Sequence, residues 1–321
     1  MATRYKANTA ILFKIETTPG VDAAPTGAAD AVLVTDFSVT PLDAQNVDRQ
    51  FVRPYFGGYG QLVGTASVKI GFSVELAGSG TAGTAPQWGD MMIACAHAEA
   101  SLTTPARVEY TPASTGLKTA TIYYYDDGVL HKVLGAQGNV KLSATVGNRP
   151  TLSFDFVGLY GGVSAATAGA TDLSAWKAPV AIAKPNVTDI TLGCTYSAGA
   201  ITGGTVYAST GLDLDWGNSV SYNPLVSSES IDLTNRNVTG KTKLDLSAAD
   251  EVTWMGNVRS NVTQSLGMVI GTATGNKIVL YAPSVQLINP SKEDLNGKRV
   301  IGFDLRLVPV NGNDEIRIAC V

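Results

Sequence analysis

Apolar and polar side chains alternate with a period of two along much of this 321-residue chain. The clearest run is 65–76, where every second residue from Ala66 to Leu76 is apolar and the residues between are polar or glycine. This period predicts a β-strand with one buried face. After a loop of small residues, the apolar run 86–96 predicts a short helix, because Pro86 suits a first helical turn.

The same alternation predicts strands along the rest of the chain. We expect them at residues 31–40, 47–52, 107–111, 119–125, 129–134, 139–146, 151–160, 212–216, 230–233, 239–246, 266–271, 277–282, 284–288, 299–308 and 315–321. A second helix is predicted over 247–258, with Ser247 as its N-cap. The chain is therefore predicted to be mainly β, with two short helices.

An internal similarity indicates a duplicated unit. Residues 149–156 (RPTLSFDF) match residues 298–305 (KRVIGFDL), and in each half a loop, a long strand and a helix precede the match. A repeated order of elements indicates a repeated fold. We therefore expect an N-terminal arm, a first β unit, a connecting segment and a second β unit, over residues 1–30, 31–165, 166–205 and 206–321.

Composition and charge narrow the possible functions. The chain is 45% hydrophobic and only 16% charged, with a net charge of −4 and a pI of about 5.2. It lacks the clustered basic residues of a protein that grips nucleic acid. Three cysteines far apart in sequence argue against a disulfide framework. No run approaches the ~18 apolar residues of a membrane span, so we expect a soluble, intracellular protein.

No motif carries convincing chemistry. Residues 78–83 spell G-x-G-x-x-G, but the predicted helix begins too late and no βαβ unit follows, which favours a flexible connector. His97 and His131 lack the companions of a zinc site. Carboxylates that meet only in space leave no trace in a sequence. We nevertheless predict no enzyme, no metal and no cofactor.

The segment 49–60 is a long loop that is aromatic, basic and rich in glycine. Its large side chains are Arg49, Phe51, Arg53, Tyr55, Phe56 and Tyr59. Such a loop could stack single-stranded bases, or it could anchor a protein interface. The acidic balance of the chain favours the interface.

Four segments resemble one protein family. Residues 14–26 (KIETTPGVDAAPT), 53–60 (RPYFGGYG), 65–76 and 85–95 (APQWGDMMIAC) resemble the major tail tube proteins of bacteriophages with long, non-contractile (siphovirus-type) tails. The resemblance implies tail-tube-like β-sandwich or half-barrel units, each flanked by a helix, whose strands join those of neighbouring copies in a tube wall. With the unit duplicated, it implies pseudo-sixfold rings of three chains rather than six.

The same resemblance implies a structural virion protein that self-assembles in the bacterial host cytoplasm. Double-stranded DNA would pass without specific contacts through its stacked rings, and other tail proteins such as the tape measure and tail terminator would be partners. The implied inter-ring contacts are Lys14, Glu16, Arg49, Phe51, Arg53, Tyr55, Phe56 and Tyr59. The candidate lumen-facing acids, which lie on predicted strands, are Glu75, Asp155, Asp245 and Asp304.

A different class of function stays open. The chain could be a carbohydrate- or host-surface-binding β-sandwich of the tail tip, with tryptophans as stacking platforms. The tryptophans are Trp88, Trp176, Trp216 and Trp254. Trp88 and Trp254 lie on the two predicted helices, which favours a role in core packing for both.

Overall fold

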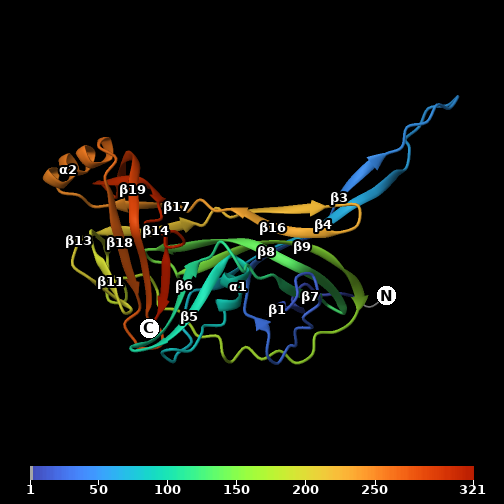
Figure 1. The fold of residues 1–321 in the computed structure, drawn as a ribbon, viewed down its shortest axis with the longest axis horizontal. Helices are drawn as coiled ribbons and strands as arrows, with labels where there is room; N and C mark the ends of the chain where they lie inside the picture. Colours follow the sequence, from blue (N-terminus) through green and yellow to red (C-terminus); the bar gives the residue numbers. More distant parts are fainter. Residues whose placement is uncertain (1–2) are drawn as a thin grey trace.

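Antiparallel strands make up most of the elongated molecule in Figure 1, a computed structural model that describes residues 3–321. Two short helices, α1 (Gly89–Ala94) and α2 (Ala248–Arg259), accompany them. The prediction of a mainly β chain with two helices is confirmed. Most strands join one large sheet, and the remaining four form two separate hairpins.

The first part of the sheet has the strand order β3–β4–β9–β8–β7–β1–β2. Its members are β1 (Thr9–Ile15), β2 (Ala31–Val32), β3 (Thr35–Asp48), β4 (Gln61–Glu75), β7 (Ala120–Asp126), β8 (Val129–Thr145) and β9 (Thr151–Ala165). Helix α1 lies between β4 and β7 in the chain.

The second part has the same order, β14–β17–β20–β19–β18–β10–β13. Its members are β10 (Ile190–Leu192), β13 (Thr205–Tyr207), β14 (Ser209–Asp215), β17 (Thr239–Leu244), β18 (Thr263–Ile270), β19 (Ile278–Leu295) and β20 (Lys298–Leu307). Helix α2 lies between β17 and β18, as α1 lies between β4 and β7. Residues can therefore be matched between the two parts through their pairing registers.

The remaining strands cover the core or project from the sheet. They are β5 (His97–Thr103), β6 (Ala106–Pro112), β11 (Thr195–Ser197), β12 (Ala200–Thr202), β15 (Ser219–Pro224), β16 (Glu229–Asn235) and β21 (Arg317–Cys320). β6 pairs with β21, so a strand from the first half of the chain is fixed by the C-terminal strand. The sequence predicted neither β5 nor the short strands β10–β13.

Strand β8 joins the two parts into one sheet. β9 pairs along nearly the whole of β8, so β7 and β14 must share its other side. β7 pairs with the N-terminal part of β8, from Leu130 to Ala136, and β14 pairs with the C-terminal part, from Lys141 to Thr145. A single buried apolar cluster accordingly runs through both parts, and it includes Phe156, Leu214 and Phe303.

The outer strand of each part contains the same irregularity. The register of β3 shifts between Thr35 and Ser38, and that of β14 shifts between Ser209 and Leu212. Each shift contains a residue with positive φ, Asp36 at 52° and Gly211 at 120°. A Cβ on Gly211 would lie 2.1 Å from the carbonyl oxygen of Ala144 in β8, so the pairing with β8 requires glycine there.

The two helices follow the local signals of the sequence to different extents. The Ser247 side chain accepts a hydrogen bond from the Asp250 N–H at 3.1 Å, which confirms Ser247 as the N-cap of α2. α1 begins at Gly89, three residues after Pro86, and is shorter than expected. Trp88 is buried beside it, and its indole N–H donates to the Ala77 carbonyl at 2.8 Å.

The expected arm and connecting segment both contain sheet strands. Residues 9–15 form β1, which pairs with β7, and its side chains Ile11, Leu12 and Phe13 are buried. The segment 166–205 includes β10, which pairs with β18 and occupies the position that β1 has in the first part. Each of these segments thus supplies a strand to the sheet, because its apolar side chains complete a core face.

His97 gives the fold a pH dependence. Its ring is 4% exposed and lies against Trp216, and Nδ1 is 3.0 Å from the carbonyl oxygens of Met92 and Cys95. Burial of the ring lowers the pKa of His97 from 6.5 to about 4. The folded protein therefore takes up this proton at lower pH than the unfolded chain does.

We expect this histidine to make the protein less stable in acid. Its contribution is complete above pH 6.5 and is lost as pH falls from 6.5 toward 4, to a total of roughly 3 kcal/mol. Urea unfolding of the wild type and of His97→Phe between pH 4 and 7 measures the difference. His131→Gln, at the chain's other histidine, is the control and should leave most of the difference in place. Parallel pH profiles for wild type and His97→Phe would refute this assignment.

Candidate functional site: the polar face of the sheet

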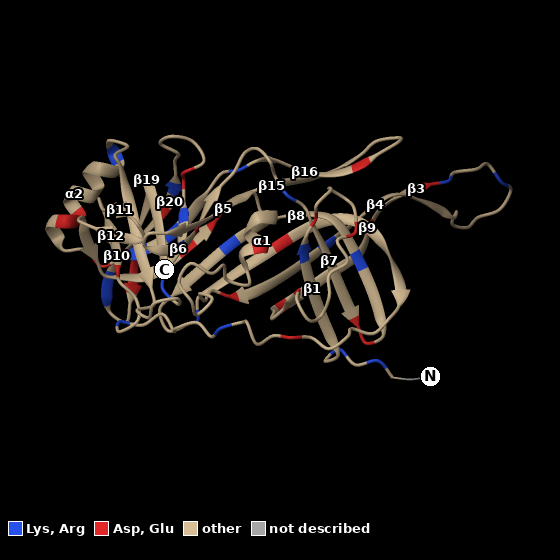
Figure 2. Cartoon of the chain, turned by 60° about the horizontal axis from the view of Figure 1, so that its bottom comes forward, with Lys and Arg blue, Asp and Glu red and all other residues tan. Residues whose placement is uncertain are grey.

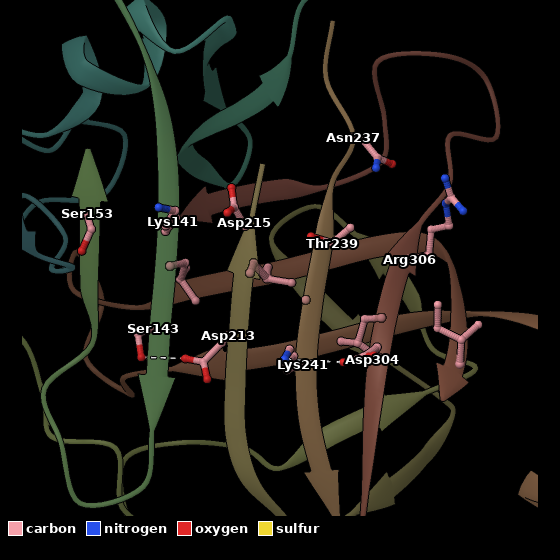
Figure 3. A pocket seen from close by; sticks show the side chains of 15 residues that line it. Lys141, Ser143, Ser153, Asp213, Asp215, Asn237, Thr239, Lys241, Asp304 and Arg306 are labelled. Atoms are coloured by element: carbon pink, nitrogen blue, oxygen red, sulfur yellow. Dashed lines mark hydrogen bonds and ion pairs between the residues drawn. The ribbon is translucent and has the colours of Figure 1, made fainter. Parts of the chain in front are cut away.

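The face of the sheet opposite the core is polar. It continues across the joint between the two parts, where β8 pairs with β14. On β9, β8, β14, β17 and β20, which are consecutive neighbours, alternate residues point away from the core. Their side chains include Lys141, Ser143, Ser153, Asp155, Asp213, Asp215, Lys241, Lys243, Asp304 and Arg306. We call this surface the polar face. Figure 3 shows its central part, which forms a shallow hollow.

All four candidate lumen acids are paired with a cation. Glu75 lies 3.5 Å from Arg149, Asp155 lies 3.2 Å from Lys141, and Asp304 lies 3.8 Å from Lys241. Asp245 forms an ion pair with Lys298. Asp155 and Asp304 are at matched positions, because each faces its neighbour in the second strand of its part, Gly71 or Lys241.

Two further acids, which the sequence analysis did not single out, lie at the joint. Asp213 accepts a hydrogen bond from Ser143 at 2.6 Å, and Asp215 accepts one from Asn139 at 2.7 Å. The strands β14 and β8 bring these side chains together, as Figure 3 shows for Asp213 and Ser143. The alternating Leu-Asp-Leu-Asp run of residues 212–215 was the signal that could have identified them.

Lysines and acids thus lie side by side on the polar face. In Figure 2 blue and red segments are scattered along the whole molecule. Lys243 extends the pattern with Glu293, at 2.5 Å, and holds the pKa of that carboxyl below its usual value. A surface of paired charges has a weak net field, because opposite charges only a few ångströms apart largely cancel at a distance.

The projecting hairpin is the most exposed feature of the chain. It consists of residues 43–67, the outer parts of β3 and β4 with the loop 49–60 as its tip, and it extends away from the body in Figure 1. Val52 and Phe56 at the tip are fully exposed. The guanidinium of Arg53 lies 4.8 Å from the ring centre of Tyr55 and 4.1 Å from that of Tyr59. Arg49 stacks on Phe51 in the same way.

The remaining predicted contact residues lie near the start of the chain. Lys14 is in β1 and is half-buried. Glu16 is 2% exposed, and its carboxylate accepts hydrogen bonds from Thr119, Thr121 and the N–H groups of Gly20 and Gly135. In this conformation Glu16 fixes the segment after β1 and presents no surface to another molecule, which corrects its assignment as a contact residue.

The tryptophans do not form binding platforms. Trp88, Trp216 and Trp254 are at most 3% exposed, and Trp176 donates its indole N–H to the Ala31 carbonyl at 3.0 Å. Within residues 3–321, no group of three or more His, Cys, Asp or Glu side chains is placed to hold a metal ion. No helix in this described range is long and apolar enough to cross a membrane.

Comparison with known protein families gives one match. A family model described as phage tail tube protein matches residues 6–313, nearly the whole chain. The chain belongs to the phage tail tube protein family. No match to a curated protein was found. The tail tube protein is therefore a structural component of the virion, and the family supports a role that is not enzymatic.

Stability measurements can separate the ion pairs of the polar face from a buried pair elsewhere in the tail tube protein. Lys241 and Asp304 are 79% and 40% exposed, so Lys241→Ala should lower the free energy of unfolding by less than about 1 kcal/mol. Arg236 and Glu315 are 8% and 10% exposed at 2.9 Å, so Arg236→Ala should cost about 3–5 kcal/mol. Equal effects in denaturant unfolding would show that the polar-face pairs also hold the fold together.

Proposed function

We propose that this tail tube protein forms rings of three chains, in which each chain supplies two tandem wall units. The rings stack into the tube of a long, non-contractile tail, and double-stranded DNA passes through it during ejection. The observation that carries the proposal is the pairing of β8 with β14, because it is a ready-made junction between two units of the same strand order.

The two ends of the chain's sheet have the strands needed to repeat that junction. β19 matches β8, and β3 matches β14. Past Gln286, β19 pairs only with β20 within residues 3–321, and β3 pairs only with β4. Unpaired edges favour the addition of another strand. We therefore assign β3 of one chain to the free edge of β19 in the next.

The matched registers predict how these edges would meet. Asp213 faces Ser143 in the chain's own junction, and the corresponding residues are Ser38 in β3 and Glu293 in β19. By the same correspondence Val39 would face Lys292, and Thr40 would face Ser291. Asp36 stands where β14 has Gly211, so its Cβ would clash and the ladder should end at Phe37.

The stoichiometry follows from the number of units in each chain. A sixfold ring built from single units needs six chains, and a chain with two units reaches the same number with three. Each ring would alternate three junctions within chains and three between chains. Closure pairs the long free edges of β3 and β19, which suits a protein that must assemble without uncontrolled aggregation.

The polar face suits the inner wall of such a ring. Its lysines lie beside acids, and Asp213 and Asp215 add negative charge, so it offers little attraction to a passing phosphate backbone. We assign Glu75, Asp155, Asp245 and Asp304 to this wall. The loop 49–60 reaches farthest from the body, and we assign its aromatic and basic residues to contacts between stacked rings. Assembly would take place in the bacterial cytoplasm, with the tape measure and tail terminator as further partners.

A cysteine cross-link tests the junction between chains. In Ser38→Cys/Glu293→Cys, paired residues on adjacent strands come close enough for a disulfide. The native cysteines Cys95, Cys194 and Cys320 are buried, and burial raises their pKa, so they should not compete. We expect covalent species of two and three chains after oxidation, which neither single variant forms. Absence of linked chains in assembled material would contradict the proposed junction.

A further inference from the structure

A second hairpin in the chain shows what the projecting hairpin lacks. β15 and β16 form a hairpin (residues 219–235) between β14 and β17, at the same place in the second part that the projecting hairpin has between β3 and β4. We call it the docked hairpin. It runs along β8 and β9 of the first part, whereas the projecting hairpin stands free of the body (Figure 1).

The docked hairpin is anchored at its base. The Asn218 side-chain amide donates to the carbonyls of Cys95 and Gly138, both at 3.0 Å, and its backbone N–H donates to the Asn139 side chain at 2.9 Å. Trp216, just before it, is fully buried and donates its backbone N–H to the Val140 carbonyl. These anchors all lie on the neighbouring unit, not on the hairpin's own unit.

Side chains along the strands of the docked hairpin also contact that neighbour. Ile231 is 5% exposed, and it lines a small cavity together with Leu233, Gln137 and Leu159. The tip takes no part, because Val226 is fully exposed. Docking is thus a property of the hairpin strands and requires a second unit beside them.

The projecting hairpin carries the same kind of apolar side chains without a neighbour to cover them. Val47, Leu62 and Val63 on its strands are 54%, 53% and 65% exposed. Covering such side chains is favourable in proportion to the apolar area removed from water. In the described residues 3–321, β4 pairs with β9 only from Ser67 onward, and the hairpin strands before that point pair only with each other.

We infer that the strands of the projecting hairpin dock across β19 and β20 of the next chain in the same ring, as the docked hairpin lies across β8 and β9. The inference rests on the proposed ring, since β3 and β4 lead directly from the edge that would pair with β19. Val308 occupies the position of Leu159, and Val310 beside it is 60% exposed. The occupant of this surface is therefore a second copy of the chain.

The docking assigns two roles to one hairpin. Its strands would contact the neighbouring chain within a ring. The longer tip, residues 49–60, would extend past that contact and bind the next ring. The docked hairpin has only the short turn 225–228 at its tip and would serve the first role alone.

A second cysteine pair tests the docking separately from the ring. Val63 corresponds to Leu233 and Val308 to Leu159, so Val63→Cys/Val308→Cys should give linked species of two and three chains upon oxidation. Val226→Cys/Val308→Cys is the matched control and should stay unlinked, because the exposed tip of the docked hairpin belongs to another junction.

The possible outcomes separate the two proposals. Linked chains from both Val63→Cys/Val308→Cys and Ser38→Cys/Glu293→Cys support the ring and the docking together. Linked chains from Ser38→Cys/Glu293→Cys alone overturn the docking and leave the ring intact. Linked chains from neither pair overturn both. Equal linkage of the Val226 control would show that the cysteines react without specific docking, and would also overturn the inference.

Discussion

Proline in the free edge of β3 is expected to weaken ring assembly while the monomer stays folded. Successive N–H groups of an edge strand point alternately toward its partner and away from it. Of Ser38→Pro and Val39→Pro, one therefore removes a bond to β4 and the other removes a donor from the open edge. The second variant should match the wild-type monomer in its melting temperature within a few degrees.

The expected loss of assembly free energy is multiplied, because each ring contains three junctions between chains and each junction loses the same hydrogen bond. One ladder hydrogen bond is worth ~1 kcal/mol, so three junctions lose roughly 3 kcal/mol, which lowers the association constant of the ring on the order of a hundredfold. Because three chains associate, the concentration at half-assembly varies as the inverse square root of that constant and should rise on the order of tenfold. Sedimentation velocity across a concentration series measures this. Val226→Pro is the control, since that residue lies on the fully exposed tip of the docked hairpin, outside the proposed ladder. Unchanged assembly by both edge variants would show that β3 is not the joining strand.

Removal of the Trp216 side chain is expected to destabilise the fold strongly. This residue is fully buried where the two parts of the sheet meet, and its ring lies 5.8 Å from that of His97. Trp216→Ala should lower the free energy of unfolding by about 3–5 kcal/mol, through lost apolar contact and the cavity left behind. Because the residue also leads into the docked hairpin, proteolysis near residues 219–235 should become faster.

Denaturant unfolding and limited proteolysis check this result. Val226→Ala, on the fully exposed tip of the docked hairpin, is the matched control and should change stability by less than about 0.5 kcal/mol. A Trp216→Ala variant as stable as the control would mean that the two parts pack independently of this side chain. The joint would then depend on the β8–β14 ladder alone.

Local patterns in the sequence were enough for most of the fold. Strict alternation over 65–76 predicted the long strand β4, the strand expected at 151–160 lies in β9, and the N-cap of α2 followed from one serine. The match of residues 149–156 to 298–305 corresponds to matched strands, since β9 and β20 pair with β4 and β17 in the same way. Such features depend on neighbours in the chain, which a sequence displays directly.

Long-range pairing was beyond the sequence. Nothing in residues 9–15 indicates that they pair with β7, and the short runs of β10 and β13 have too few residues for a visible period. Glu16 was predicted to lie on the surface. It is buried, because its carboxylate binds hydroxyl groups of residues more than a hundred positions away in the chain. The junction of β8 with β14 likewise depends on which strands meet in space.

The candidate site was predictable in part for the same reason. The sequence identified Asp155 and Asp304 through the repeat and placed both on predicted strands. It did not identify the lysines that pair with them. Lys141 and Lys241 come from adjacent strands and become partners only through the register. The sequence showed only the candidate acids of the polar face, and the structure adds the lysines that lie beside them.

Electron cryo-microscopy of the assembled tube tests the central claim most directly. We predict rings of three chains with six wall units, in which junctions within a chain and between chains alternate and β3 of each chain continues the sheet from β19 of its neighbour. Rings of six chains, or rings in which the edges of β3 and β19 stay unpaired, would contradict the account.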